Sequence, residues 1–342
     1  MTMTDIPTWQ DIENAHEVVS EIVLETACWH ASKLSEIYDS RIFLKREDRQ
    51  KVRSYKIRGA YNKIRSLSHK DLERGVVCAS AGNHAQGVAF SCAKLKARGY
   101  IFMPEITPLQ KIDSVKYFGK EYVEIRLVGK TFDDAAAAAK AFSLENGLTF
   151  VPPFDDPYVI AGQGTTAREI LSQAASAGVS LDYVFVPIGG GGLASGVATY
   201  LKGKSPSVKV IGVEPEGAAC MKAAIAAGGP VTLEQIDTFV DGAAVGRAGD
   251  ITYRICSELL DDVMTVPEGA VCTAMLEMYN RNGMVLEPAG ALSVTALRFC
   301  KDMIMGKNVC CILSGSNNDV VRISDIMRRS SEYESALQGR EC

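Results

Sequence analysis

The order of strands and helices predicted along this chain indicates an α/β fold. Apolar segments typical of strands alternate with helical segments in two stretches, roughly residues 75–150 and 182–326. Several of the strands, such as 183–188, are apolar throughout, which is typical of parallel sheets covered by helices on both faces. We therefore predict two lobes, each with a mostly parallel sheet flanked by helices. The proline-rich segment 152–157 is predicted to cross between them.

The individual elements follow from apolar spacing and from the residues at their ends. In the helix predicted over 131–147, for example, Thr131 suits the N-cap and Gly147 suits the turn that ends the helix. Strands are predicted over residues 41–45, 75–80, 100–104, 122–129, 148–154, 183–188 and 208–215, and in the apolar start of 308–319. Helices are predicted over residues 8–21, 61–67, 88–97, 108–119, 131–147, 165–177, 193–203, 218–227, 250–260, 267–282, 289–305 and 319–329. The polar tail, 330–342, is expected to be loosely ordered.

Length and composition exclude several classes of protein. The chain has 342 residues, of which 47% are hydrophobic and 23% charged, and this is enough for a substantial core. A formal net charge of −4 argues against a nucleic-acid binder. The N-terminus lacks the apolar segment of a signal peptide, and no apolar run reaches the length of a membrane span. We expect a cytoplasmic protein that binds neither nucleic acid nor a membrane.

The ten cysteines do not indicate a metal site. None of them forms a CxxC pair and the chain has only four histidines, so zinc is not expected. Scattered cysteines commonly behave as small buried hydrophobic residues. A chain of this size needs no disulfide framework, which fits a reducing compartment.

Four consecutive glycines, Gly189, Gly190, Gly191 and Gly192, lie between a predicted buried strand and a predicted helix that begins at Leu193. Backbone N–H groups without side chains in the way can converge on an anion at the start of a helix. The run has neither the lysine of a P-loop nor the spacing of a dinucleotide-binding loop. It predicts a phosphate site. The alternative is a tight turn that needs a positive φ, for which two glycines would suffice.

The loop Ser80-Ala81-Gly82-Asn83-His84 also joins a predicted strand to a helix. Its small residues let a ligand approach the backbone, and the start of the helix offers N–H groups to a carboxylate. The amide of Asn83 can donate a hydrogen bond to a phenolic oxygen or accept one from its protonated form. The structural alternatives are an N-cap for Asn83 and an ordinary hydrogen-bonding role for His84.

Two further features complete a candidate cofactor site. The segment 314–318, which begins with Ser314, follows the last predicted strand, and ligands of open α/β sheets bind at the carboxyl ends of strands. Lys56, preceded by Tyr55, could be a surface charge, or its amine could form a Schiff base with a carbonyl cofactor. A cofactor with a phosphate, a ring oxygen and a ring nitrogen would engage all of these loops together.

These segments resemble the threonine dehydratases (threonine ammonia-lyases) among the fold-type-II pyridoxal-phosphate enzymes. The resemblance spans about residues 12–334 and is carried by LKREDRQKVRSYKIRGAYNKI, CASAGNHAQGVAFSCAKL, FVPPFDDPYVIAGQGT, VPIGGGGLASGVATY, VIGVEPEGA, FVDGAAVGRAGDIT, LEPAGALSV and LSGSNND. It is most similar to the shorter bacterial form of the isoleucine-pathway enzymes. It implies a tryptophan-synthase-β-like fold with a large domain of 1–52 and 153–329, a linker helix and small domain of 53–152, and a tail.

The resemblance also implies the function and a role for each site residue. Lys56 would bind pyridoxal 5'-phosphate and act as the base at the substrate Cα, with Tyr55 packed near the cofactor. Asn83 would meet the ring oxygen, Ser314 the ring nitrogen, and the N–H groups of 189–193 the phosphate. The substrate carboxylate would lie at 80–84. The implied reaction is the conversion of L-threonine to 2-oxobutanoate and ammonia, with L-serine as a further substrate, in a homodimer or homotetramer.

Departures from the family pattern leave alternatives open. Biosynthetic members usually carry a C-terminal regulatory (ACT-like) domain that senses isoleucine and valine, and we expect no feedback control through such a domain in this chain. A serine racemase or serine dehydratase would share the scaffold, but racemases have a serine at the position of Ala81. Racemases also bind a divalent cation near the positions of Glu214, Ala218 and Cys220. Glu214 is present, but Cys220 replaces the second carboxylate, so no metal is expected. A non-catalytic phosphate-binding α/β protein is a further alternative. It would not require Lys56, Asn83 and Ser314 together.

Overall fold

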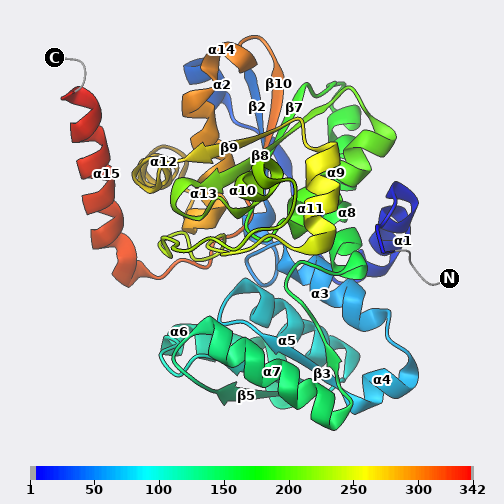
Figure 1. Ribbon diagram of the computed structural model, residues 1–342. Coiled ribbons are helices and arrows are strands. Elements are labelled where there is room, and N and C mark those ends of the chain that lie inside the picture. Colours follow the sequence, from blue (N-terminus) through cyan, green and yellow to red (C-terminus); the bar gives the residue numbers. More distant parts are fainter. Residues whose placement is uncertain (1–4, 340–342) are drawn as a thin grey trace.

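Two separate β-sheets organise the protein, as the computed structural model of residues 5–339 shows (Figure 1). The larger sheet has the strand order β1-β2-β10-β7-β8-β9, and every neighbouring pair is parallel except β1 with β2. Its strands are β1 (Cys28–His30), β2 (Arg41–Lys45), β7 (Tyr183–Pro187), β8 (Lys209–Pro215), β9 (Asp262–Val266) and β10 (Asn308–Ile312). The predicted α/β class, with mostly parallel sheets, is confirmed.

The smaller sheet is parallel throughout, with the order β5-β4-β3-β6. It comprises β3 (Val76–Ala79), β4 (Gly99–Met103), β5 (Val123–Leu127) and β6 (Thr149–Phe150). Helices α5 (Asn83–Leu95), α6 (Leu109–Gly119) and α7 (Phe132–Asn146) flank it, and α4 (His69–Arg74) lies at its edge in the lower lobe (Figure 1). The alternating side chains of β3 show how the layers form: Val76 and Cys78 pack toward α5, whereas Val77 and Ala79 pack toward α7.

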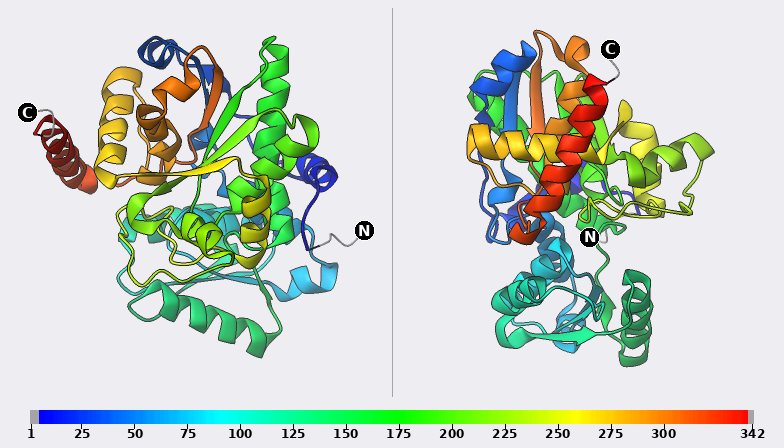
Figure 2. Two further views of the ribbon diagram at one scale, coloured as in Figure 1. Left: turned by 45° about the horizontal axis from the view of Figure 1, so that its top comes forward. Right: turned by 90° about the vertical axis from the view of Figure 1, so that its left-hand side faces the viewer.

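Helices cover both faces of the larger sheet for the same reason (Figure 2). Val184 and Val186 of β7 share a core with α1 (Trp9–Val19), α8 (Pro157–Ser176) and α9 (Gly192–Lys204), whereas Phe185 points to the opposite face. The core on that second face includes α12 (Glu268–Asn282) and α13 (Pro288–Ala296). The remaining helices of this lobe are α2 (Ser32–Tyr38), α10 (Cys220–Ala227), α11 (Asp250–Leu259), α14 (Lys301–Ile304) and α15 (Ile323–Gln338). Within residues 5–339, no helix combines the length and apolarity needed to cross a membrane.

The prediction of a loosely ordered tail was wrong for residues 330–338. Helix α15 continues to Gln338, and residues 340–342 lie outside the described part of the chain. Its charges pair along the helix, as between Arg328 and Glu332, and such pairs stabilise a polar helix. Ser330 is buried against α12, where its hydroxyl lies 2.9 Å from that of Thr273.

Other helices also differ from their predicted bounds. The helix predicted over 88–97, α5, begins at Asn83 with Gly82 as its N-cap. The helix predicted from 165 begins at Pro157, because the Asp156 side chain accepts the N–H groups of Tyr158 and Val159 and Pro157 suits the first helical position. The helix predicted over 289–305 divides into α13, a short 3₁₀ turn (Leu297–Phe299) and α14.

One helix joins the two lobes and carries the lysine of the candidate site. Helix α3 (Lys56–Arg65) begins at Lys56 itself, several residues before the predicted start at 61. It packs against α5 of the small lobe and α8 of the large one. Both contacts are close: a Cβ at Gly59 would overlap the Gln163 side chain of α8, and a Cβ at Gly87 of α5 would lie only 3.0 Å from the carbonyl oxygen of Lys56. Lys56 therefore lies at the junction of the lobes.

Candidate active site

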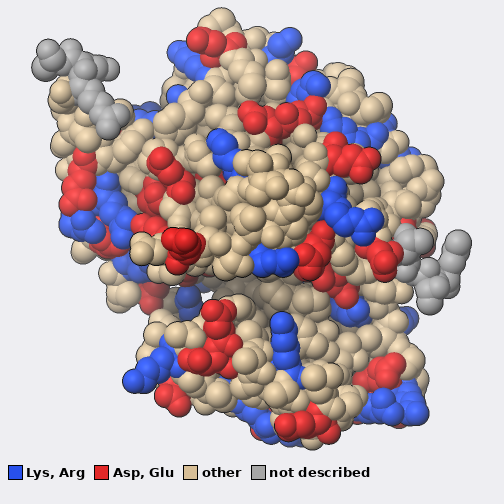
Figure 3. All heavy atoms as spheres, viewed as in Figure 1, with Lys and Arg blue, Asp and Glu red and all other residues tan. Residues whose placement is uncertain are grey.

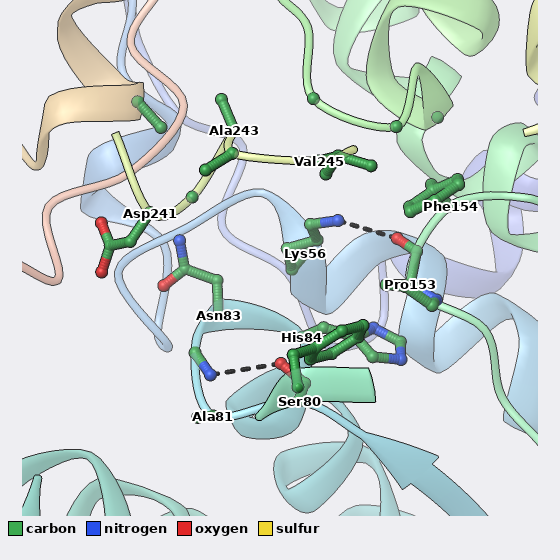
Figure 4. Close-up of a pocket in the computed structure, with 18 of the residues that line it drawn as sticks. Lys56, Ser80, Ala81, Asn83, His84, Pro153, Phe154, Asp241, Ala243 and Val245 are labelled. Atoms are coloured by element: carbon green, nitrogen blue, oxygen red, sulfur yellow. Dashed lines mark hydrogen bonds between the residues drawn. The ribbon is translucent and has the colours of Figure 1, made fainter. Parts of the chain in front are cut away.

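A cavity of about 1110 Å³ lies between the two lobes (Figures 3 and 4). The loops that follow β3, β7 and β10 open into it, so the three predicted loops meet at the carboxyl ends of parallel strands. The predicted site residues that line it are Tyr55, Lys56, Ser80, Ala81, Gly82, Asn83, His84, Gly189, Gly190, Gly191, Gly192, Leu193 and Ser314.

Lys56 projects into the cavity from the first turn of α3, which makes the surface-charge interpretation wrong. Its Nζ donates to the carbonyl oxygen of Pro153 at 2.7 Å and lies 5.4 Å from the centre of the Tyr55 ring (Figure 4). Burial lowers the pKa of Lys56 to about 8, against the opposing effect of the Glu287 carboxylate. A neutral amine, the nucleophilic form, is therefore accessible near neutral pH.

The glycine run is more than a tight turn. Only Gly191 has a positive φ, +93°. The neighbouring glycines are needed for space, because a Cβ at Gly192 would lie 2.9 Å from Cβ of Phe154 and one at Gly190 would overlap the ring of that residue. The first intrahelical bond of α9 runs from the N–H of Ser195 to Gly191, which leaves the N–H groups of 192–194 without an intrahelical acceptor. The chain thus forms a cradle of N–H donors suited to a phosphate.

Asn83 is the first residue of α5, and Gly82 occupies the N-cap. The N-cap interpretation of Asn83 is therefore wrong. Its side chain bonds across the cavity wall instead: Nδ2 donates to Oε1 of Glu287 at 2.6 Å, and Oδ1 accepts from Nδ2 of Asn317 at 2.6 Å. Ser80 stabilises the loop through its Oγ, which accepts the N–H of Gly82 (Figure 4). The open N-terminus of α5 suits a carboxylate.

His84 is a buried neutral residue beside this loop. Its Nε2 lies 2.9 Å from the carbonyl oxygen of Val151, which can only accept, so Nε2 carries the proton. Burial, together with the charge of Lys56, lowers the pKa of His84 to about 3. The imidazole therefore adds no positive charge for a substrate carboxylate, and the backbone N–H is what His84 can offer there.

Ser314 follows the end of β10 and is buried, with 3% of its surface exposed. Its Oγ donates to the carbonyl oxygen of Ala289 at 3.2 Å. The cavity wall at this point thus carries a neutral hydroxyl, which can accept a further hydrogen bond, or donate its single hydrogen to a ligand in place of Ala289.

The sequence interpretation missed Glu287, which lies beside Asn83. It is the residue before Pro288 at the start of α13, and such a position suggests a helix cap, yet its side chain does not cap that helix. Burial and the nearby charge of Asp241 raise the pKa of Glu287 to about 7, although N–H groups of Asn83 and Asn317 oppose this. Glu287 is 5% exposed, lines the cavity and influences the charge of Lys56, which makes it a candidate functional residue.

A second missed residue, Asp155, supports the wall that holds Lys56. Its carboxylate accepts the N–H groups of Asp250, Ile251 and Thr252 at the start of α11. These bonds cap the helix and fix the segment that carries the Pro153 carbonyl. Pro153 to Asp155 belong to the stretch that was predicted as a crossing between lobes. The strand predicted over 148–154 would have included Pro153 and Phe154 and was too long, because β6 ends at Phe150.

Glu214 and Cys220, which lie at the positions of the racemase cation site, form hydrogen bonds with nearby backbone groups. The Glu214 carboxylate accepts the N–H groups of Met221 and Lys222 at 2.7 and 2.9 Å, and Sγ of Cys220 donates to the carbonyl oxygen of Gly189. Among residues 5–339 no group of three or more His, Cys, Asp or Glu side chains is placed to hold a metal ion.

Comparison with known proteins identifies the family. The family model described as "Pyridoxal-phosphate dependent enzyme" matches residues 19–315. The chain belongs to this family. Membership makes pyridoxal phosphate its cofactor, as the sequence predicted, and the glycine cradle and buried lysine fit the phosphate and the aldehyde of that molecule.

Among proteins of known name, this chain is similar to biosynthetic L-threonine dehydratases over most of its length. L-threonine dehydratase biosynthetic IlvA of Bacillus subtilis (strain 168) is 52% identical over 323 residues, which cover 94% of this chain and 76% of that protein. The protein of the same name from Halalkalibacterium halodurans is 50% identical over 325 residues, covering 95% of this chain and 78% of its own length.

Solved structures with a similar fold include a threonine deaminase and a serine racemase. The processed form of threonine deaminase isoform 2 from Solanum lycopersicum has a TM-score of 0.90 and 40% identity, covering 94% of this chain and 88% of its own. Maize serine racemase has a TM-score of 0.86 and 30% identity, covering 96% of this chain and 99% of its own.

Proposed function

We propose that this protein is an L-threonine ammonia-lyase, which converts L-threonine to 2-oxobutanoate and ammonia as the first step of isoleucine biosynthesis. The observation that carries the proposal is the convergence of Lys56, the glycine cradle, Asn83 and Ser314 on one cavity. The identity of about 50% to biosynthetic L-threonine dehydratases supports this choice of substrate.

The residues of the cavity would hold pyridoxal phosphate at each of its functional groups. Lys56 would bind its aldehyde carbon, the N–H groups of residues 189–193 its phosphate, Asn83 its ring oxygen and Ser314 its ring nitrogen, with Tyr55 packed alongside. When bound, the cofactor supplies an electron sink for the pair left at Cα. Because Ser314 is neutral, it does not enforce protonation of the ring nitrogen, which favours prompt loss of the β-hydroxyl.

The chain's own groups would then orient the substrate and move its protons. The N-terminus of α5, with residues 80–84, would hold the substrate carboxylate, and the amine of Lys56 would remove the proton from Cα. The β-hydroxyl leaves as water. The hydroxyl gains a proton as it leaves, which balances the proton that Lys56 removes from Cα. The released enamine tautomerises to an imine, and the imine takes up that equivalent of water to give 2-oxobutanoate and ammonia.

Ala81 favours elimination over racemisation. A racemase needs a second acid–base group to protonate the opposite face of Cα, and the methyl group of Ala81 cannot do this. L-serine lacks only one methyl group relative to L-threonine, and such a difference is worth about 1–3 kcal/mol of discrimination, so we expect L-serine to be deaminated too. The serine racemase structures, at 30% identity, make racemisation the second candidate.

Three further features belong to the proposal. We place the large domain at 1–52 and 153–329 and the small domain with its linker helix at 53–152; the division of β3–β6 from the other strands supports this. We also propose a homodimer or homotetramer in the cytoplasm, in line with the resemblance to the biosynthetic enzymes.

The test incubates the purified holoenzyme with L-threonine or with L-serine and measures the keto acids and the D-serine that form. We expect 2-oxobutanoate from L-threonine, slower formation of pyruvate from L-serine, and no D-serine. Lys56→Ala should abolish both the turnover and the absorbance of the lysine-bound cofactor. Appreciable D-serine with little keto acid would favour the racemase, and an uncoloured wild-type protein without turnover would favour a non-catalytic phosphate binder.

A further inference from the structure

The amide of Asn83 is held at both ends by a chain of hydrogen bonds. Nδ2 of Asn317 donates to the carbonyl oxygen of Val52 at 2.9 Å and to Oδ1 of Asn83 at 2.6 Å. Nδ2 of Asn83 donates to Oε1 of Glu287 at 2.6 Å. Oε2 of Glu287 accepts the backbone N–H of Asn317 at 3.1 Å, which closes the chain into a loop.

The carbonyl group of Val52 determines which side chain donates and which accepts in each of these hydrogen bonds. A backbone carbonyl can only accept, so Asn317 must present its NH₂ group, and both hydrogens of that group are then used. Asn83 must therefore present its oxygen to Asn317 and its NH₂ group to Glu287. A flipped Asn83 amide would place two NH₂ groups against each other, which excludes the ambiguity that amide side chains usually carry.

The NH₂ group of Asn83 has a second hydrogen beyond the one given to Glu287. Resting on the cofactor placement under the proposed function, we propose that Glu287 and Asn317 are positioning residues that hold Asn83 as a hydrogen-bond donor toward the ring oxygen of pyridoxal phosphate. The ring oxygen is then kept in its deprotonated form. The sequence left open whether Asn83 donates to this oxygen or accepts from it.

The space around Glu287 is shaped for this purpose. A Cβ on Gly315 would overlap Oε1 of Glu287, so the residue next to Ser314 must be glycine. The carboxylate forms no bond with the N-terminus of its own helix, α13, and both of its oxygens are used by Asn83 and Asn317. The hydrogen bonds of the Glu287 carboxylate thus hold the side chain of Asn83 and the backbone of Asn317.

The charges that face Glu287 come from several elements. The negative charge of Glu287 acts to raise the pKa of Lys56 in α3. The pKa of Glu287 is itself raised by the charge of Asp241 and lowered by that of Lys111 in α6. The phenol of Tyr55 also faces it, and the carboxylate helps to keep that phenol protonated by raising its pKa. The two accepted N–H groups favour the ionised form of Glu287, the form in which it must accept from Asn83.

The test measures the absorbance of the bound cofactor as a function of pH, in holoenzyme without substrate. Glu287→Gln offers one acceptor to two donors, and Asn317→Ala removes the bond to Oδ1 of Asn83. In both variants we expect the form with a protonated ring oxygen to grow and its titration midpoint to rise by about one pH unit, as for loss of one hydrogen bond to a charged group. The matched control, Glu214→Gln, alters an equally buried carboxyl that accepts the N–H groups of Met221 and Lys222, and its midpoint should stay at the wild-type value.

A double-mutant cycle separates positioning from an independent role. If Glu287 acts through Asn83, adding Glu287→Gln to Asn83→Ala changes the midpoint far less than Glu287→Gln does alone. Additive effects, or a wild-type titration in both Glu287→Gln and Asn317→Ala, would overturn the proposal. Should Glu287→Gln fail to fold, Asn317→Ala with Asn83→Ala gives the same cycle.

The outcome also separates this inference from the proposed function. The titration needs only the cofactor, so the expected shift in an enzyme that does not deaminate L-threonine would leave the positioning role intact and remove the proposed function. Wild-type titrations in both Glu287→Gln and Asn317→Ala, in variants that still deaminate L-threonine, would do the reverse.

Discussion

At the scale of single residues, burial decides the chemistry of Lys56. Its pKa of about 8 lies well below that of a free lysine because the surrounding protein removes water from the ammonium group. We expect the rate at which apoenzyme takes up pyridoxal phosphate to rise with pH and to reach its midpoint near pH 8, since the neutral amine attacks the aldehyde. Stopped-flow absorbance measures this rate.

The sign of the effect on stability follows from the same shift. A lowered pKa in the folded apoenzyme means that the unfolded chain binds more protons between about pH 8 and 10.4, the value for an unperturbed lysine, so this group makes the apoenzyme more stable as pH rises through that range. Lys56→Met should remove this pH dependence from the unfolding free energy. An uptake rate still climbing tenfold per pH unit above pH 9 would contradict the lowered pKa.

The glycine cradle gives a second residue-scale prediction. A Cβ at Gly190 overlaps the Phe154 ring, so Gly190→Ala must displace the ring or the glycine loop. Displacement of the loop moves its N–H groups away from the phosphate, and we expect the affinity for pyridoxal phosphate to fall roughly tenfold to a hundredfold. Gly229→Ala is the control, because no atom lies within 4 Å of the added Cβ. Equal affinities of the two variants, measured by cofactor titration, would show that the cradle does not contact the phosphate.

The candidate site could be predicted from sequence only where one segment carries the chemistry. The glycine run and Lys56 stand out locally, because each has a pattern that a phosphate or an aldehyde requires. The polarity of Asn83 could not be predicted, since it depends on Glu287, 204 residues away, and on Asn317, 234 residues away. Glu287 itself resembles a helix cap in sequence, and only the fold shows that its carboxylate turns toward Asn83.

At the scale of elements, helices with strong terminal signals were predicted well and edge elements were not. Thr131 and Gly147 bound α7 as predicted, through a capping box and a left-handed C-cap. Strand β1 was missed because it has three residues and takes its conformation from antiparallel pairing with β2 at the sheet edge. The apolar periodicity of α8 identified its second half, whereas its start is set by Asp156 and Pro157.

A buried charge network attaches α3, and with it Lys56, to the large lobe. Arg58 binds Glu47 and Glu169 at 2.8 and 2.7 Å, and Lys45 binds Glu169 at 2.6 Å, with all four side chains at most 1% exposed. Removing one charge leaves its partners unpaired and buried, so Glu169→Gln should lower the unfolding free energy by about 3–5 kcal/mol. Denaturant unfolding measures the loss.

An exposed pair provides the comparison for this network. Glu124 of β5 pairs with Arg98, which precedes β4, and with Arg126, and these side chains are largely in water, so Glu124→Gln should cost far less than Glu169→Gln. If both variants lose the same small amount, the network does not carry the stability of the α3 attachment.

At the scale of the whole molecule, one carboxylate at the mouth of the cavity connects the lobes. Asp241 belongs to the loop of the large lobe that borders the cavity, and Figure 4 shows it beside Asn83. Its oxygens accept from Lys111 of α6, in the small lobe, at 2.9 Å and from Arg322, before α15, at 3.2 Å. The ion pair with Lys111 therefore spans the cleft that Figure 3 shows between the lobes.

Asp241→Asn should affect catalysis more than stability. Exposed ion pairs contribute about 0–1 kcal/mol, so the unfolding free energy should change little. Weaker closure of the lobes should raise KM for L-threonine and make KM less dependent on salt.

Asp241→Asn should also shift the acid limb of the pH profile of activity to lower pH. Asp241 raises the pKa of Glu287, and without that negative charge Glu287 ionises more easily and keeps accepting from Asn83 at lower pH. Lys111→Ala breaks the same bridge but removes a positive charge near Glu287, so it should raise KM while moving the acid limb the opposite way. An acid limb that moves in the same direction in both variants would exclude Glu287 as the titrating group.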